Sequence, residues 1–104
     1  MYIGKVKLTN QWQELETLIQ EQVDGQSAFS FDSSVTYQLQ SESKYGARLC
    51  VTASAPADDV DGFIISGDKT AHFKPETGLK LYVRHGAETT CPPMFLKISA
   101  MGED

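Results

Sequence analysis

The sequence predicts a mostly β protein: an antiparallel β-sandwich or jelly-roll-like barrel of about eight short strands, with one short α-helix near the N-terminus. Three observations support this. Apolar and polar residues alternate along several short segments, which is the pattern of half-buried strands. Turn-forming residues separate these segments at intervals of about 8–12 residues, a spacing typical of antiparallel sandwiches and barrels. Helical spacing occurs in one segment, close to the N-terminus.

The strand pattern is clearest in residues 47–54, where Ala47, Leu49, Val51 and Ala53 alternate with other residues. The short apolar run 63–65 predicts a buried strand. After the last predicted strand, residues 101–104 are expected to form a frayed polar tail. The predicted strands cover residues 1–8, 27–31, 35–40, 47–54, 63–65, 70–74, 79–84 and 94–100.

Residues 11–23 predict one amphipathic helix. Asn10 is a suitable N-cap, and Gln13 follows it at capping-box spacing. Asp24-Gly25 is a typical helix end. A single apolar stripe indicates that the helix lies against a sheet edge or closes an open end of a barrel. The stripe consists of Trp12, Leu15, Leu18, Ile19 and Val23.

Length and composition are those of one folded domain spanning residues 1–104, with 40% hydrophobic and 22% charged residues. No apolar run approaches the roughly 20 residues of a membrane span. The first eight residues lack the apolar stretch of a signal peptide, so we expect a protein made in a cytoplasm. The net charge is −5, and the nine basic residues do not cluster in sequence. We therefore expect neither a nucleic acid nor a membrane as partner.

The cysteines and histidines form no recognisable metal or redox motif. Cys50 and Cys91 are predicted to be reduced, partly buried thiols, with a bridge between them as the alternative. His72 and His85 lack zinc-ligand spacing and are expected at the surface. The acidic loop 58–62 matches a calcium-binding loop poorly, because Ala57, which has no ligand oxygen in its side chain, would occupy the first ligand position. We expect no metal and no cofactor.

No catalytic arrangement is evident either. Cys50 lies within a strand, and Cys91 precedes Pro92-Pro93, which lack the N–H groups that an oxyanion hole uses. We therefore predict that the chain is not an enzyme. Trp12 is expected in the core, with a sugar-binding platform as the alternative. Tyr37 and Tyr82 are expected in the core or at its rim.

Several stretches together resemble small structural proteins of tailed-bacteriophage virions, and the resemblance extends over most of the chain. It implies a compact β domain that assembles on a phage particle, as a head decoration or cement protein or as a head or tail accessory protein. It brings no catalytic residues. The stretches are residues 7–15, 37–40, 53–56, 61–67 and 78–84.

Two functions follow as hypotheses. The first is an oligomeric virion protein, made in the host bacterial cytoplasm, that binds capsid or tail subunits and copies of itself. Its contacts would come from the N-terminal strand, which could add to a neighbouring sheet, and from the loop 85–93. The second is a carbohydrate-binding β-sandwich that uses Trp12 as its platform. The predicted contact residues of the first hypothesis are Tyr2, Ile3, Lys5, His85, Pro92 and Pro93.

Overall fold

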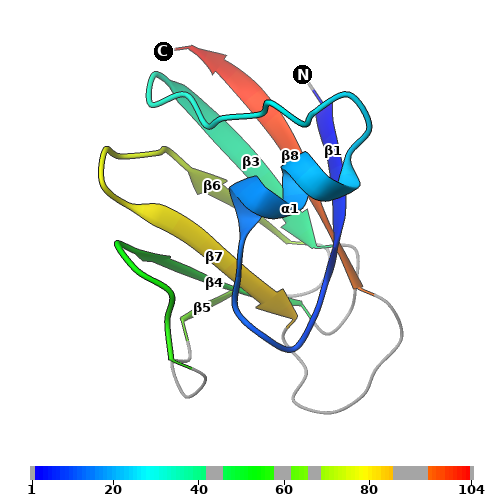
Figure 1. Cartoon of the computed structure of the whole chain (residues 1–104), viewed down its shortest axis with the longest axis vertical. Coiled ribbons are helices and arrows are strands. Elements are labelled where there is room, and N and C mark those ends of the chain that lie inside the picture. The colour runs from blue at the N-terminus through cyan, green and yellow to red at the C-terminus, as the bar shows by residue number, and fades with distance from the viewer. Residues whose placement is uncertain (1, 42–45, 58–61, 66–68, 86–93, 104) are drawn as a thin grey trace.

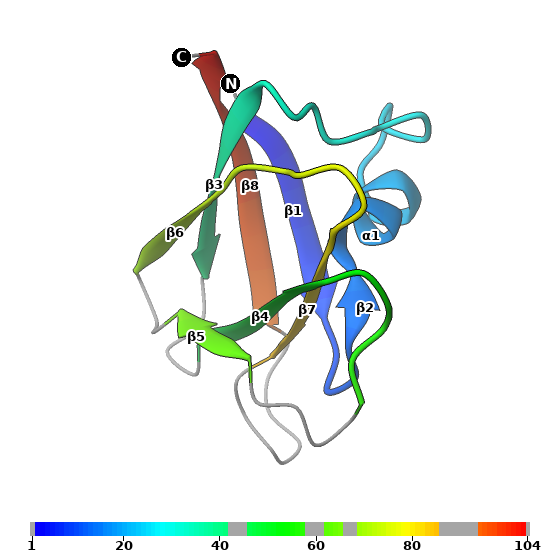
Figure 2. The ribbon, with the colours of Figure 1, turned by 90° about the vertical axis from the view of Figure 1, so that its left-hand side faces the viewer.

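Two antiparallel four-stranded sheets face each other in the computed structural model, which describes residues 2–41, 46–57, 62–65, 69–85 and 94–103. Sheet A has the strand order β1-β8-β3-β6, and sheet B has the order β2-β7-β4-β5 (Figures 1 and 2). The predicted β-sandwich of eight strands with one short helix is confirmed. The elements are β1 (Tyr2–Leu8), β2 (Gln13–Glu14), α1 (Leu15–Gln22), β3 (Val35–Ser41), β4 (Ala47–Thr52), β5 (Phe63–Ile65), β6 (Thr70–Phe73), β7 (Lys80–His85) and β8 (Met94–Glu103).

The core lies between the sheets and follows from the alternation in the sequence. Successive side chains of a strand point to opposite faces, so every second residue of β3 from Tyr37 onward is buried. In β4 the pattern holds for Ala47 and Leu49, but Val51 is 43% exposed, contrary to the alternation in the sequence. Tyr37 and Tyr82 are buried, as expected. Removing these apolar surfaces from water is the main stabilising contribution, at roughly 25 cal/mol per Å². The largest fully buried apolar side chains are Val6, Leu15, Ile19, Leu39, Val83, Leu96 and Ile98.

The helix α1 closes one side of the sandwich. It contacts β1 of sheet A and β2 and β7 of sheet B, and it buries Leu15, Leu18 and Ile19. Figure 2 shows α1 and β2 on one side of the molecule and the edge strands β5 and β6 on the other. The expected position of the helix at a sheet edge is therefore confirmed. Within the described residues, no helix is long and apolar enough to cross a membrane.

The predicted start of the helix is wrong by four residues. The helix begins at Leu15, and Glu14 is its N-cap, without a capping side-chain hydrogen bond. Before it, Gln13 and Glu14 form β2 and pair with Val83 and Tyr82 of β7. The Thr9 side chain accepts a hydrogen bond from the Gln11 N–H, which fixes a turn where the helix was expected. Strand pairing and this local turn override a pattern that is helical in the sequence alone.

Residues 27–31 are not a strand, although their alternation predicts one. α1 satisfies their backbone groups instead: Gln20 Nε2 donates to the Phe29 carbonyl (2.7 Å), and the Phe31 N–H donates to Glu16 Oε1 (2.9 Å). Phe31 packs edge-to-face on Tyr37, with ring centroids 4.9 Å apart. The alternating pattern therefore belongs to an irregular segment whose phenylalanine side chains pack against the core.

The expected frayed tail is also wrong for residues 101–103, which continue β8 to Glu103. Val35 of β3 pairs with Glu103, and the register shifts between Val35 and Tyr37. A register shift of this kind lets a strand continue past an irregularity. Strand pairing thus extends closer to the C-terminus than the polar sequence indicates.

Candidate binding recess and exposed sheet edges

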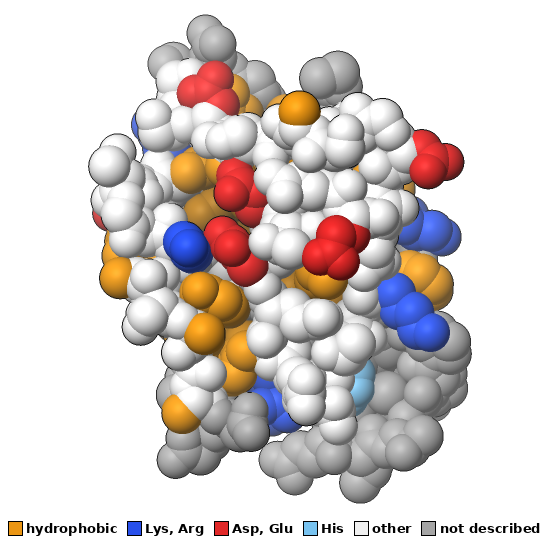
Figure 3. All heavy atoms as spheres, in the orientation of Figure 1, with side chains coloured by type: hydrophobic (Ala, Val, Ile, Leu, Met, Phe, Trp, Pro, Cys, Tyr) orange, Lys and Arg blue, Asp and Glu red, His pale blue; other side chains and the backbone are white. Residues whose placement is uncertain are grey.

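A surface recess of about 370 Å³ lies beside the start of α1. Figure 3 shows acidic side chains around a hollow whose bottom is apolar, to the left of α1. The recess is assembled from segments that are distant in sequence: the β2–α1 junction, the segment before β3, the end of β6, the turn that follows it and the start of β7. Its size falls within the range of about 300–1,000 Å³ of typical small-ligand sites.

The apolar part of the recess is built from two phenylalanines and a leucine. Phe31 and Phe73 pack edge-to-face with ring centroids 5.3 Å apart. Phe73 and Leu81 are buried, whereas Phe31 is half-buried. Phe31 is held by its N–H bond to Glu16, and Phe73 by the pairing of β6 with β3. The floor is therefore fixed by secondary structure rather than by a loop alone.

The polar part of the recess is mostly acidic. Glu14, Glu16 and Glu76 line it, and Lys80 is the one basic residue among the described lining residues. Two of these carboxylates accept a hydrogen bond from a neutral donor: Glu14 Oε1 accepts from the Thr17 hydroxyl (3.3 Å), and Glu16 Oε1 accepts from the Phe31 N–H. Counting these four charges gives the recess a net formal charge of −2, from three carboxylates and one ammonium.

The predicted N-terminal contact strand is an edge strand, but α1 occupies part of its open edge. The Lys7 N–H donates to Gln22 Oε1 (2.7 Å), and Gln22 Nε2 donates to the Lys7 carbonyl (3.3 Å). Val23 packs against the backbone of Gly4. A further strand could add to this part of β1 only by displacing α1.

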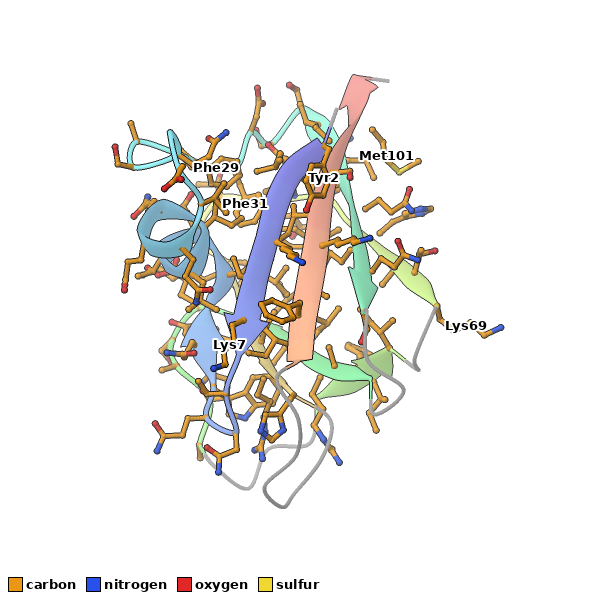
Figure 4. All side chains as sticks on the ribbon, turned by 90° about the vertical axis from the view of Figure 1, so that its right-hand side faces the viewer. Tyr2, Lys7, Phe29, Phe31, Lys69 and Met101 are labelled. Atoms are coloured by element: carbon orange, nitrogen blue, oxygen red, sulfur yellow. The ribbon has the colours of Figure 1, made fainter. Side chains whose placement is uncertain are left out.

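The predicted contact residues of β1 differ in exposure. Tyr2 is 57% exposed, Lys5 is exposed and Ile3 is half-buried. The Lys5 ammonium lies 4.8 Å from the centre of the Phe95 ring, on the outer face of sheet A. Figure 4 views β1 and β8 with Tyr2, Lys7 and Met101 labelled. The role of these residues as contacts remains a prediction.

The predicted loop contact is described only at its first residue. His85 is 8% exposed, and its backbone N–H donates to the Thr9 carbonyl (2.9 Å). The expectation of a surface histidine is therefore wrong for His85, because β7 carries it into the interior, and correct for the exposed His72. Pro92 and Pro93 lie outside the described residues.

The remaining candidate ligand residues do not gather into a metal centre in the described part of the chain. No group of three His, Cys, Asp or Glu side chains is placed to hold a metal ion there. Residues 58–61 of the acidic loop, and Cys91, lie outside the described residues. Cys50 is a half-buried free thiol.

Trp12 is half-buried and lies outside the helix. The Arg84 guanidinium is 5.7 Å from the centre of its ring, and a Cβ at Gly62 would lie 2.8 Å from Trp12 Cη2. The indole Nε1 is buried without a hydrogen-bond partner. A sugar platform needs an exposed ring face, and this packing does not favour one.

The strongest apolar exposure lies on β5, where the sequence predicts a buried strand. Ile65 is buried, but Phe63 is 76% exposed and Ile64 is 58% exposed. Within the described residues, β5 pairs with β4 alone and forms the edge of sheet B. The prediction of a fully buried strand is therefore wrong: an edge position leaves two of the three apolar side chains in water.

Comparison of the chain with protein-family models, with curated proteins and with solved structures finds no significant match.

Proposed function

We propose that this chain is a non-enzymatic structural protein that assembles with copies of itself and with other protein subunits. The observation that carries the proposal is the edge strand β5 with its exposed apolar residues Phe63 and Ile64, one on each face of the strand. An edge strand offers unpaired backbone groups that a second chain can join, and exposed apolar residues add buried area to that contact.

The two sides of the sandwich differ in a way that supports this choice of surface. On one side, α1 lies along the edge of β1, and Gln22 takes both backbone groups of Lys7. On the other side, β5 exposes large apolar side chains. Exposed hydrophobic side chains on an open sheet edge favour association unless the edge is blunted by charge or cover. We therefore place the contact at β5, the edge strand that carries the large exposed apolar residues.

Within this class, we propose a virion protein of a tailed bacteriophage, of the head decoration, cement or accessory type. The support is the resemblance of residues 7–15, 37–40, 53–56, 61–67 and 78–84 to such proteins, together with the small β-sandwich fold. In such a role each contact contributes a modest affinity, and many copies on one particle together give a much higher avidity.

Charged substitutions on β5 test the contact surface. We expect Phe63→Lys combined with Ile64→Lys to shift the protein to smaller species in sedimentation velocity, because lysine on an edge strand opposes strand addition. Met101→Lys is the matched control, since Met101 is also an exposed apolar residue but lies on β8 of sheet A. The assignment to β5 would be contradicted if both variants lost assembly equally, or if neither variant lost it.

A further inference from the structure

We propose that the recess beside α1 binds a guanidinium or alkylammonium group, that is, an organic cation carried on an apolar stem. This inference concerns a surface separate from β5 and stands independently of the proposed assembly. The recess combines a fixed aromatic floor, an acidic rim and a volume of about 370 Å³. Each of these features restricts the class of ligand.

The charge of the rim selects a cation. Three carboxylates, those of Glu14, Glu16 and Glu76, line the recess with one ammonium group. Glu14 and Glu16 each accept a hydrogen bond from a neutral donor, a hydroxyl and a backbone N–H respectively. A carboxylate that accepts only from a neutral donor keeps further lone pairs for a charged one. Hydrogen bonds from a cationic donor to a carboxylate are about twice as strong as neutral ones.

The floor selects a cation with an apolar part rather than a hydrated metal ion. Phe31, Phe73 and Leu81 line the recess, and half-buried Phe31 leaves carbon surface in water that a ligand gains by covering. A cation can also lie against an aromatic ring, which contributes further attraction. A small inorganic ion would leave this apolar surface in water, and metal ions such as Mg²⁺ keep several of their own waters.

Guanidinium fits this combination better than ammonium. Its planar group donates in pairs to carboxylates, stacks on aromatic faces and is less strongly hydrated than an ammonium ion. One recess is lined by Glu14 and Glu16 of the β2–α1 junction and by Glu76 of the β6–β7 turn. We therefore expect arginine-like ligands to bind more tightly than lysine-like ligands.

The experiment is a titration of the full chain with N-propylguanidinium, followed by backbone amide chemical shifts. We expect saturable shifts at Glu16, Phe31 and Phe73, weaker binding of N-propylammonium and no binding of neutral N-propylurea. Equal binding of the urea, or shifts that do not saturate, would overturn the proposal.

Charge-neutral variants test which groups hold the cation. Glu16→Gln combined with Glu76→Gln should lower affinity by at least about tenfold, because charge-assisted hydrogen bonds are lost. Glutamine retains an oxygen that can accept from the Phe31 N–H, so the floor is preserved. Glu21→Gln is the matched control, an exposed acidic residue of α1 outside the recess. An equal loss with the control would show a general charge effect and overturn the proposal.

A second titration distinguishes the source of the cation. If a free small molecule is the ligand, N-propylguanidinium should bind at least as tightly as the blocked tripeptide Gly-Arg-Gly. If an arginine side chain of a partner protein is the ligand, the tripeptide should bind more tightly, because its backbone adds contacts at the rim. Both results support recognition of the guanidinium group, whereas failure of both ligands to bind would overturn it.

Discussion

Gly4 allows the end of α1 to pack directly on the backbone of β1. A Cβ at this position would lie 2.7 Å from Val23 Cγ1 and 2.8 Å from Val23 Cγ2. We expect Gly4→Ala to lower the free energy of unfolding by about 1–3 kcal/mol, the usual cost of overpacking a filled site. Chemical denaturation measures this change.

A double-mutant cycle with Val23→Ala isolates the cause. Because the shorter side chain removes both γ carbons, Gly4→Ala should cost less in the Val23→Ala background than in the natural chain. The same cost in both backgrounds would show that packing against Val23 is not the reason for glycine at this position.

Alternation predicts the burial of many individual residues, including Val6 and Leu8 of the edge strand β1, but it fails at particular positions. Leu39 and Leu49 follow the alternation and are buried. Phe63 and Ile64 are equally apolar but lie on an edge, and His85 is polar but lies on β7, which is flanked by β2 and β4. Strand order decides these cases, and strand order depends on pairings between distant segments that periodicity does not encode.

At the scale of elements, Gln22 acts as a substitute strand partner for β1. We expect Gln22→Ala to speed amide hydrogen exchange at Lys7 and to lower stability by about 0.5–1.5 kcal/mol, since two hydrogen bonds to one residue are lost. Glu21→Ala is the control because Glu21 is the adjacent exposed residue of α1. Unchanged exchange at Lys7 would show that the Gln22 side chain does not protect this edge.

The turn before β3 depends on an Asp32 carboxylate. Hydrogen bonds from the Ser34 hydroxyl and the Ser34 N–H lower the pKa of Asp32 below its ordinary value. These hydrogen bonds therefore stabilise the fold at pH values above the Asp32 pKa of the unfolded chain. Their contribution is lost as pH falls through the lower Asp32 pKa of the folded chain.

Ser34→Ala tests this account. Removing the hydroxyl donor should raise the pKa of Asp32 toward its ordinary value, and the remaining Ser34 backbone bond should keep part of the shift. Carbon-13 NMR of the Asp32 carboxyl, recorded as the pH is lowered, measures the change. A pKa that does not rise would contradict the assignment of the hydroxyl as the main cause.

The boundaries of helices and strands are hard to predict for the same reason as residue burial, because they also depend on contacts between distant segments. The sequence predicts the existence and type of α1 correctly, because Leu15, Leu18 and Ile19 share one face. It misplaces the start, because the pairing of Gln13 and Glu14 with β7 involves residues about 70 positions away. Residues 27–31 mislead for a related reason: side chains of α1, rather than a neighbouring strand, satisfy their backbone.

At the scale of the whole molecule, the sandwich class is predictable but the candidate sites are not. Eight short segments and one helix predict two packed sheets. The recess brings together Glu14, Phe31, Phe73 and Glu76, which come from four separate segments. No local motif links them, so only the folded chain reveals that acidic and aromatic residues line one recess.

The native mass of the unmodified chain tests the central claim of assembly most directly. The measurement is size exclusion with light scattering over a wide range of protein concentration. The exposed apolar edge of β5 predicts a mass that is a multiple of 11.5 kDa and that rises with concentration to a defined oligomer. A mass of 11.5 kDa at every concentration would contradict self-assembly through this edge.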